Sequence, residues 1–357
     1  GENHEVCDLW GGRRVSTPTT PGPSTTTVIQ TAIAEKPSRG IVGFMKRQAQ
    51  QSLAFGTLIV LVVFFSIFGS GFFTWSNISG VLLATAVIGV LALGTTFVIV
   101  TGGIDLSIGT GMTLASVMTG VFIVNMGMPV WLGVIGGVAT GALMGLINGV
   151  NVAILKLPPF LATLAMMMIA QGLALIISGV RPIYFSGVAP NFKDIALGTL
   201  IPGLPNAVLI TIVLAVVAYL VLSKTILGRY TFAIGSNEEA TRLSGVNTRR
   251  WKIAIYTFAG AFTGVAGVLM ASRLDSAQPQ LGMGYELQAI AAVIIGGTSL
   301  LGGRGSILGT VIGALIMSVL VNGLRIMSIQ SEWQNIVVGI VVLLAVFLDS
   351  LRNRQRT

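Results

Sequence analysis

The chain has 357 residues, of which 53% are hydrophobic and only 9% are charged, and its mean hydropathy is +0.88. Because a soluble domain carries more charge and a smaller apolar share, the composition excludes a soluble globular protein and indicates a polytopic membrane protein. The single Cys7 excludes an intrachain disulfide, and the single His4 excludes a histidine proton relay in the membrane, since both lie in the N-terminal segment.

The two ends of the chain are polar. Residues 1–45 are rich in Thr, Ser and Pro (VSTPTTPGPSTTT), a composition that cannot bury enough apolar surface to fold, so we predict a disordered cytoplasmic tail. Residues 350–357 are predicted to be a short cytoplasmic C-terminal tail. The remaining residues, 46–349, are predicted to form one transmembrane domain.

Apolar runs long enough to cross a bilayer recur through this domain. They predict an all-α integral membrane protein with about ten transmembrane helices, at roughly 53–69, 78–100, 106–124, 130–155, 160–179, 206–223, 253–271, 287–301, 306–324 and 333–348. The eighth run is short and interrupted by glycines, so it is either a half-length helix or a re-entrant segment. The boundary at 100–106 is open in the same way.

Basic residues predict the orientation. With both termini in the cytoplasm and ten crossings, 17 of the 21 Lys and Arg residues lie inside and four lie outside. The net charge of +9 is therefore explained by topology, and we expect no nucleic-acid partner.

One carboxylate stands near a predicted span end, in TGGIDLSIGTG. Asp105 follows the pair Gly102–Gly103 and precedes Ser107. A charge in this position is costly unless it is paired, hydrated or bonded to the backbone, so these residues are candidates for a path or gate. Alternatively, Asp105 caps the third span by accepting amide hydrogen bonds from Ser107 or Ile108, and the two roles are compatible.

The pattern GGxxLxxGxG, which begins at Gly102–Gly103, occurs again at Gly296–Gly297. If the likeness is not chance in a chain with 46 glycines, it indicates an internal two-fold repeat with broken helices near the path. Gly296 and Gly297 are therefore further path or gate candidates.

The charged loop 224–252 contains IGSNEEATRLSG. Ser236 and Glu239 fit a capping box that starts a short helix, and Gly245 is placed to end it in the left-handed conformation. Such a short helix is marginal alone in water, so it needs a surface on which to dock. The segment is either a docking helix for a cytoplasmic partner or an ordinary basic loop that enforces topology.

Four stretches carry a resemblance that covers about residues 50 to 349: TGGIDLSIGTGMTLAS, PPFLATLAMMMIAQGL, LGRYTFAIGSNEEATRLSGVNTRRWKI and SAQPQLGMGYELQAIAAVIIGGTSLLGGRGSILGTVIGALI. Together they resemble the permease subunits of ribose-type ATP-binding-cassette sugar importers. The resemblance implies a permease for a monosaccharide in the bacterial inner membrane. It also implies a second permease subunit, cytoplasmic ATPase subunits and an extracytoplasmic sugar-binding protein as partners, in a lipid bilayer.

The same resemblance implies a role for the charged loop: it would sit in a cleft of the ATPase and couple the ATPase to the spans. The positions assigned to this coupling loop are Gly235, Asn237, Glu238, Glu239, Ala240, Arg242, Leu243, Ser244 and Gly245.

No Lys follows a Gly anywhere in the chain, so the GK[ST] element of a phosphate-binding loop is absent. We expect ATP and Mg²⁺ on the partner subunits, and no catalytic residue, cofactor or metal in this chain, which is predicted to be a transport subunit and not an enzyme. Two alternatives stay open: a related permease for branched-chain amino acids or another small solute, and an ion-coupled secondary transporter, which would need more buried carboxylates than Asp105.

The predicted outer loops, 180–205 and 272–286, could receive the binding protein or be solvated, and Arg325 is placed to pair with Glu332. Aromatic residues are only 7% of the chain, so we expect no tight sugar site in the path. The polar span residues that could line a weak path, or bond helices together, are Asn148, Asn151, Thr163, Gln171 and Asn322.

Overall fold

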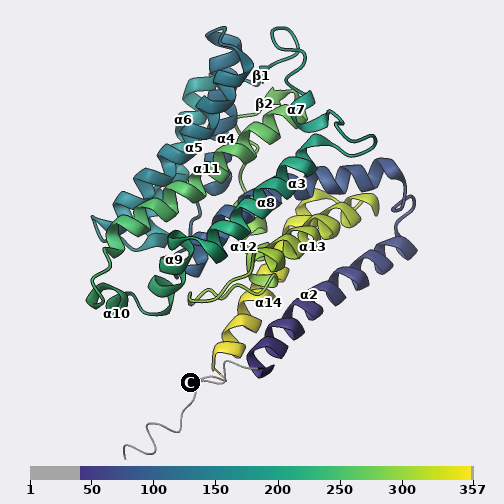
Figure 1. Cartoon of the computed structure of the whole chain (residues 1–357). Coiled ribbons are helices and arrows are strands. Elements are labelled where there is room, and N and C mark those ends of the chain that lie inside the picture. The colour runs from purple at the N-terminus through teal and green to yellow at the C-terminus, as the bar shows by residue number, and fades with distance from the viewer. Residues whose placement is uncertain (1–40, 355–357) are drawn as a thin grey trace, which may run out of the picture. The chain divides into compact units, whose positions relative to one another are not determined.

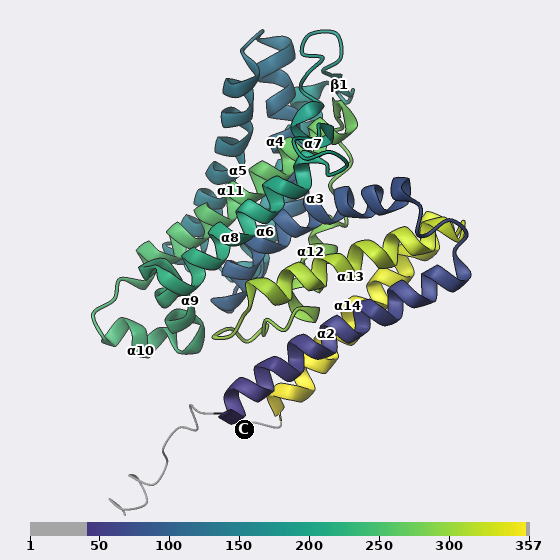
Figure 2. The same ribbon diagram turned by 45° about the vertical axis from the view of Figure 1, so that its right-hand side comes forward.

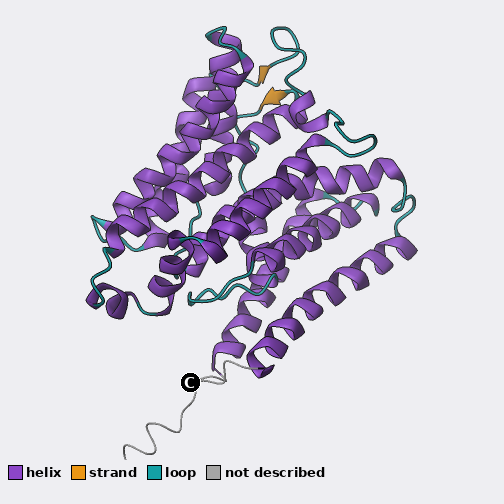
Figure 3. Cartoon of the chain, viewed as in Figure 1, coloured by secondary structure: helices purple, strands orange, loops and turns teal. Residues whose placement is uncertain are grey.

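The computed structural model describes residues 41–354, with side chains for residues 52–351, and this part of the chain is mostly helical (Figures 1 and 3). The tail predicted for residues 1–45 lies outside the described residues as far as residue 40. Residues 355–357 of the predicted C-terminal tail also lie outside them. The compact unit described below begins at Ala49.

The elements follow one another along the chain as helices joined by short loops. They are α2 (Ile41–Phe68), α3 (Trp75–Val100), α4 (Ile108–Gly120) with a π-helical extension (Val121–Asn125), α5 (Val130–Ala153), α6 (Pro159–Ser178), β1 (Ile183–Tyr184), α7 (Asp194–Leu197), α8 (Asn206–Lys224), α9 (Ile226–Ser236), α10 (Glu238–Leu243), α11 (Thr248–Leu274), β2 (Ser276–Ala277), α12 (Tyr285–Ile295), α13 (Ile307–Ile326) and α14 (Ser331–Arg354). The two short strands pair antiparallel, with Ile183 opposite Ala277. They lie at one end of the bundle, and α10 lies at the other (Figure 1).

The predicted spans are confirmed as helices. Within the described residues, eight helices are long and apolar enough to cross a membrane, and Ser52–Phe68 and Tyr285–Ile295 are shorter apolar helices. The eighth predicted span is a half-length helix, because α12 ends at Ile295 with Gly296 as its C-cap. The seventh was placed too late: α11 begins at Thr248, five residues before the prediction, because Asn247 caps it by accepting a hydrogen bond from the Arg250 amide at 3.1 Å.

Helix α3 lies at the centre of the core. Its residues from Thr85 to Val100 are all buried, and the helix is apolar on every side, as expected for a segment surrounded by other helices. It packs against α8, α11, α12 and α13. Phe97 meets Phe258 of α11 edge to face, with ring centroids 5.0 Å apart. Segments on either side of the α10 loop are therefore joined through α3.

Helices α5 and α11 pack backbone to backbone. A Cβ added at Gly260 would lie 2.9 Å from the Gly145 Cα, and one at Gly264 would lie 2.7 Å from the Val138 Cα. Small residues at such spacing let transmembrane helices approach closely. This pair joins the start of α11, beside α10, to the rest of the bundle.

Among the described residues, four helices have membrane-length windows that are mostly exposed. Only 28% of the window of α5 and of α6, 22% of α8 and 11% of α14 is buried. Figure 2 shows α14 alongside the part of α2 that belongs to this unit, residues 49–68. Phe65 and Phe72, in α2 and just after it, pack against Leu320 and Leu324 of α13. The outward faces of these four helices thus offer apolar surface to lipid or to another subunit.

Candidate functional site

Helix α10 is a six-residue helix held at both ends. Its N-cap is Asn237, whose Oδ1 accepts a hydrogen bond from the Ala240 amide at 2.9 Å. The cap predicted at Ser236 was wrong by one residue, because Ser236 is the last residue of α9 and the extended backbone of Asn237 separates the two helices. The prediction for Gly245 is confirmed: it follows the helix in the left-handed conformation, with φ +84°.

The α10 surface is almost entirely exposed. Thr241 is the one buried residue of the helix, and its hydroxyl bonds the Asn237 carbonyl at 2.8 Å. Leu243, by contrast, is 78% exposed, an unusual position for a large apolar side chain beside so many charges. Since the caps and not a hydrophobic face hold α10, its outer surface is free for contact with another molecule.

The two carboxylates of α10 each form an ion pair. Arg242 bonds Glu239 within the helix at 2.6 Å, with both side chains more than 60% exposed, and such a pair contributes about 1 kcal/mol or less. Lys252 of α11 bonds Glu238 at 2.6 Å, and its side chain is only 18% exposed. The second pair ties the start of α10 to the first turns of α11.

Helix α9, which the sequence analysis did not predict, supports α10. Thr225 caps it by accepting from the Gly228 amide at 3.4 Å, and Tyr230 packs against Trp251 of α11, with ring centroids 4.8 Å apart. Gly228, Thr231 and Ile234 form its buried face. These residues recur every three positions along LGRYTFAIG, and this spacing places them on one face of a helix. It could have indicated α9 within the segment predicted as the charged loop.

The C-terminal end of α9 contacts two loops that contain glycines. We call this contact the glycine junction, and it is formed by Gly102, Gly235, Gly302 and Gly303. The Gly303 amide donates to the Val100 carbonyl at 2.8 Å. A Cβ at Gly235 would overlap that carbonyl oxygen and lie 2.6 Å from the Gly303 nitrogen. One at Gly302 would lie 2.8 Å from the Gly235 oxygen and 2.9 Å from the Gly102 nitrogen. Three segments far apart in the chain are thus in backbone contact.

Asp105 lies beyond the junction in a buried polar node. Its Oδ1 accepts hydrogen bonds from the Ser107 amide at 2.8 Å and the Ser107 hydroxyl at 2.6 Å, so the predicted amide bond from Ser107 is confirmed. The predicted cap is wrong, because the N-cap of α4 is Ser107 and no side chain caps the helix. Asn148 of α5 donates to the Ser107 hydroxyl at 2.8 Å. Thr163 of α6 accepts from the Leu106 amide at 3.2 Å. Loop 101–107 is therefore fixed by α5 and α6, and two of the polar span residues bond this loop.

The remaining path or gate candidates are placed separately. A Cβ at Gly103 would lie 2.6 Å from the Tyr256 hydroxyl, and one at Gly296 would overlap the Gly309 backbone of α13. Gly297 lies two residues after α12 and has φ +96°. The second copy of the GGxxLxxGxG pattern differs in conformation from the first, since Gly109 lies in α4 whereas Gly303 lies in a loop, so a two-fold repeat stays a prediction.

Known proteins resemble the chain along most of its length. The family model described as "Branched-chain amino acid transport system / permease component" matches residues 77–346. The ribose import permease protein RbsC of Escherichia coli (strain K12) is 40% identical over 309 residues, which cover 86% of this chain and 96% of that protein. RbsC of Bacillus subtilis (strain 168) is 44% identical over 292 residues, 82% of this chain and 90% of that protein. The fructose import permease protein FrcC of Rhizobium meliloti is 37% identical over 299 residues, 82% of each chain. No solved structure gives a significant match.

Proposed function

The chain belongs to the family of the branched-chain amino acid transport system permease component, and from this premise we propose that it is the membrane-spanning permease subunit of an ATP-binding-cassette importer for a monosaccharide such as ribose. The relatives named above, two ribose permeases and one fructose permease, support a sugar substrate. The protein would form the translocation path and leave hydrolysis of ATP to partner subunits, which would hold ATP and Mg²⁺.

The observation that carries the proposal is α10 and its connection to the bundle. An exposed, capped helix with an outward Leu243 and two carboxylates suits a cleft on a separate subunit. Movement of α10 would reach α3 through the glycine junction, where Gly235 meets Val100 and Gly303 without intervening side chains. Backbone contact of this kind transmits a displacement with little loss, because no flexible side chain lies between the segments.

The distribution of basic residues supports an orientation for this machine. With α10 and both termini in the cytoplasm, the inner side holds 17 of the 21 Lys and Arg residues. The end with β1 and β2 then faces outward and receives a sugar-binding protein. A second permease subunit, identical or related, would cover part of the apolar faces of α6, α8 and α14, and lipid would cover the rest.

Reconstitution tests this function. The full-length chain is placed in proteoliposomes with an ATPase and a sugar-binding protein of a ribose importer, and uptake of radiolabelled ribose is measured with and without ATP. We expect ATP-dependent uptake of ribose that exceeds uptake of leucine. Leucine uptake above ribose uptake would favour an amino-acid permease instead, and uptake by the chain alone, driven by an ion gradient, would refute the proposal.

Reversing the charge of α10 tests the docking surface. The double variant Glu238→Lys with Glu239→Lys should insert normally but lose the ATPase during purification and lose ATP-dependent uptake. It removes both α10 ion pairs as well as the carboxylates offered to the partner. Lys193→Glu, an exposed charge reversal at the other end of the bundle, is the control and should retain the ATPase. Unchanged ATPase retention in the double variant would contradict the docking role.

A further inference from the structure

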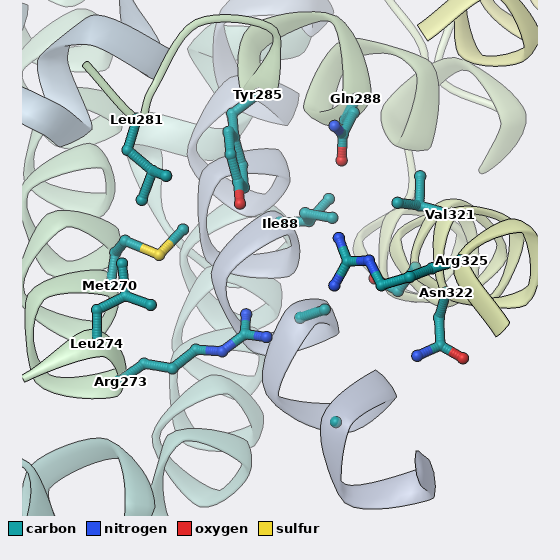
Figure 4. A pocket seen from close by; sticks show the side chains of 13 residues that line it. Ile88, Met270, Arg273, Leu274, Leu281, Tyr285, Gln288, Val321, Asn322 and Arg325 are labelled. Carbon is teal, nitrogen blue, oxygen red and sulfur yellow. The ribbon is translucent and has the colours of Figure 1, made fainter. Parts of the chain in front are cut away.

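A cavity of about 280 Å³ lies at the end of the bundle opposite to α10, between α3, α11, α12 and α13. Figure 4 shows it from close by. None of the residues predicted for the path, the gate or the coupling loop lines this cavity, apart from Asn322, named only as a polar span residue. It is therefore a second site, separate from the glycine junction and from α10.

Two arginines from different helices share this cavity. Arg273 comes from the last turn of α11 and Arg325 from the last turn of α13. In Figure 4 both guanidinium groups extend toward the middle of the cavity, and the Tyr285 hydroxyl points toward them from α12. None of the described residues that line the cavity is acidic.

Neither guanidinium has an acidic partner among the residues whose side chains are described. Within the described part of the chain, the ion pairs are the two at α10, so the pair predicted between Arg325 and Glu332 does not form. Asp275, two residues after Arg273, does not line the cavity and takes part in neither of these ion pairs. Glu286 accepts from the Gly284 amide at 3.0 Å and lies against Gly109 of α4. Two positive charges are thus left uncompensated in one recess.

Burial makes that arrangement unfavourable without an anion. Arg273 is half-buried, while Arg325 is exposed at the mouth. A charge partly removed from water loses hydration, and a like charge beside it adds repulsion, so an anion between the two would relieve both costs. The planar fork of arginine is suited to two parallel hydrogen bonds with a carboxylate or a phosphate.

The rest of the lining fits a hydroxylated carbon skeleton. Ser318 is 1% exposed, and neither its hydroxyl nor the Asn322 Oδ1 has a hydrogen-bond partner among the described residues. Gln288 adds an amide, while Ile88 and Met270 give apolar wall. Buried polar atoms without partners are rare in folded proteins, so their presence in a cavity points to a ligand that bonds them. The volume lies just below the usual range for small-molecule sites, about 300–1,000 Å³, so the ligand is small.

We propose that this cavity binds a small polyhydroxylated organic anion, with its carboxylate or phosphate between Arg273 and Arg325 and its hydroxyls at Tyr285 and Ser318. A free sugar acid, a free sugar phosphate and the glycerol phosphate headgroup of an anionic lipid share this chemistry. The assignment concerns binding alone, so it stands or falls separately from transport activity.

Binding by the full-length chain tests the proposal. The protein is purified in a polyoxyethylene detergent, which carries neither sugar nor phosphate, and titrated by calorimetry with matched probes: D-ribose 5-phosphate against D-ribose, and D-glucuronate against D-glucose. We expect the anions to bind and their neutral partners to bind at least about 10-fold more weakly, the loss of one charge-assisted contact. Repeating the titration in nanodiscs that contain phosphatidylglycerol separates the sources, because a lipid occupant would weaken binding of the added anion.

Three single variants localise the site. Arg273→Gln and Arg325→Gln should each weaken anion binding by about 10- to 100-fold. Arg181→Gln, which removes the same charge from an exposed loop outside the cavity, should leave it unchanged. Because Arg325 is exposed, its variant does not depend on core packing and reports on binding even if Arg273→Gln folds poorly.

Three results would overturn the proposal. One is equal binding of the anions and the neutral sugars. Another is anion binding that neither arginine variant weakens. The last is binding weaker than about 1 mM in both detergent and nanodiscs, which would leave the arginines for an acidic side chain of a protein partner.

Discussion

Replacing Gly235 with alanine tests whether the glycine junction is as tight as its backbone contacts indicate. The new methyl group would overlap the Val100 carbonyl oxygen and stand 2.6 Å from the Gly303 nitrogen. Neither neighbour is the end of a flexible side chain that could move aside. The Gly303 amide also donates to the same Val100 carbonyl, so any shift of Val100 away from the methyl group stretches that 2.8 Å hydrogen bond.

The size of the effect follows from two opposed contributions. Forcing one extra carbon into a packed site costs about 1–3 kcal/mol. Alanine in a helix regains about 0.5–1 kcal/mol over glycine through the lower conformational entropy of the unfolded chain. We therefore expect a net loss of about 0.5–2 kcal/mol for Gly235→Ala, concentrated where α9 meets the bundle.

The matched control is Gly172→Ala. Gly172 lies within α6, and a Cβ there would meet no atom within 4 Å, so the same change should be neutral or stabilising by about 0.5–1 kcal/mol. Trp251, in contact with Tyr230 of α9, gives a fluorescence signal close to the junction for chemical unfolding. ATP-dependent uptake is measured in parallel, and Gly235→Ala should lower it while the ATPase stays bound. Equal stability and equal uptake of the two variants would refute the inference that the glycine junction is too tightly packed for a methyl group.

Two other substitutions probe the cap and the polar node. Asn237→Ala removes the Oδ1 that accepts from the Ala240 amide, so it should lower the stability of α10 by about 1 kcal/mol and lower ATPase retention. Hydrogen exchange of the α10 amides measures this loss. Protection equal to that of the unaltered chain would contradict the capping role. Asn148→Ala removes the donor to the Ser107 hydroxyl in a fully buried site and should cost about 1–3 kcal/mol in chemical unfolding. Asn151→Ala on the same helix should change stability by less than about 0.5 kcal/mol, and an equal effect of the two would show that the node contributes nothing.

The sequence by itself determined the features that depend on local composition. Ten apolar runs, the eighth of them short, predict ten helices, because burial of an apolar helix in lipid is decided by the residues of that segment alone. The short helix in the charged loop and the left-handed Gly245 after it were likewise predictable, since a cap and a glycine act within a few residues. The bond from the Ser107 amide to Asp105 spans two residues and belongs to the same group.

Only the tertiary structure decided where these segments meet. Gly102, Gly235 and Gly303 are separated by many tens of residues, and nothing in their local sequence states that their backbones touch. The same holds for Arg273 and Arg325, which the sequence placed in different loops and the packing of α11 beside α13 brought to one cavity. The observed cap of α10 is Asn237 and not the predicted Ser236, because α9 packs on α3 and α11 and has Ser236 as its last residue. Each is a long-range contact, fixed by how the helices pack and not by the propensity of any one segment.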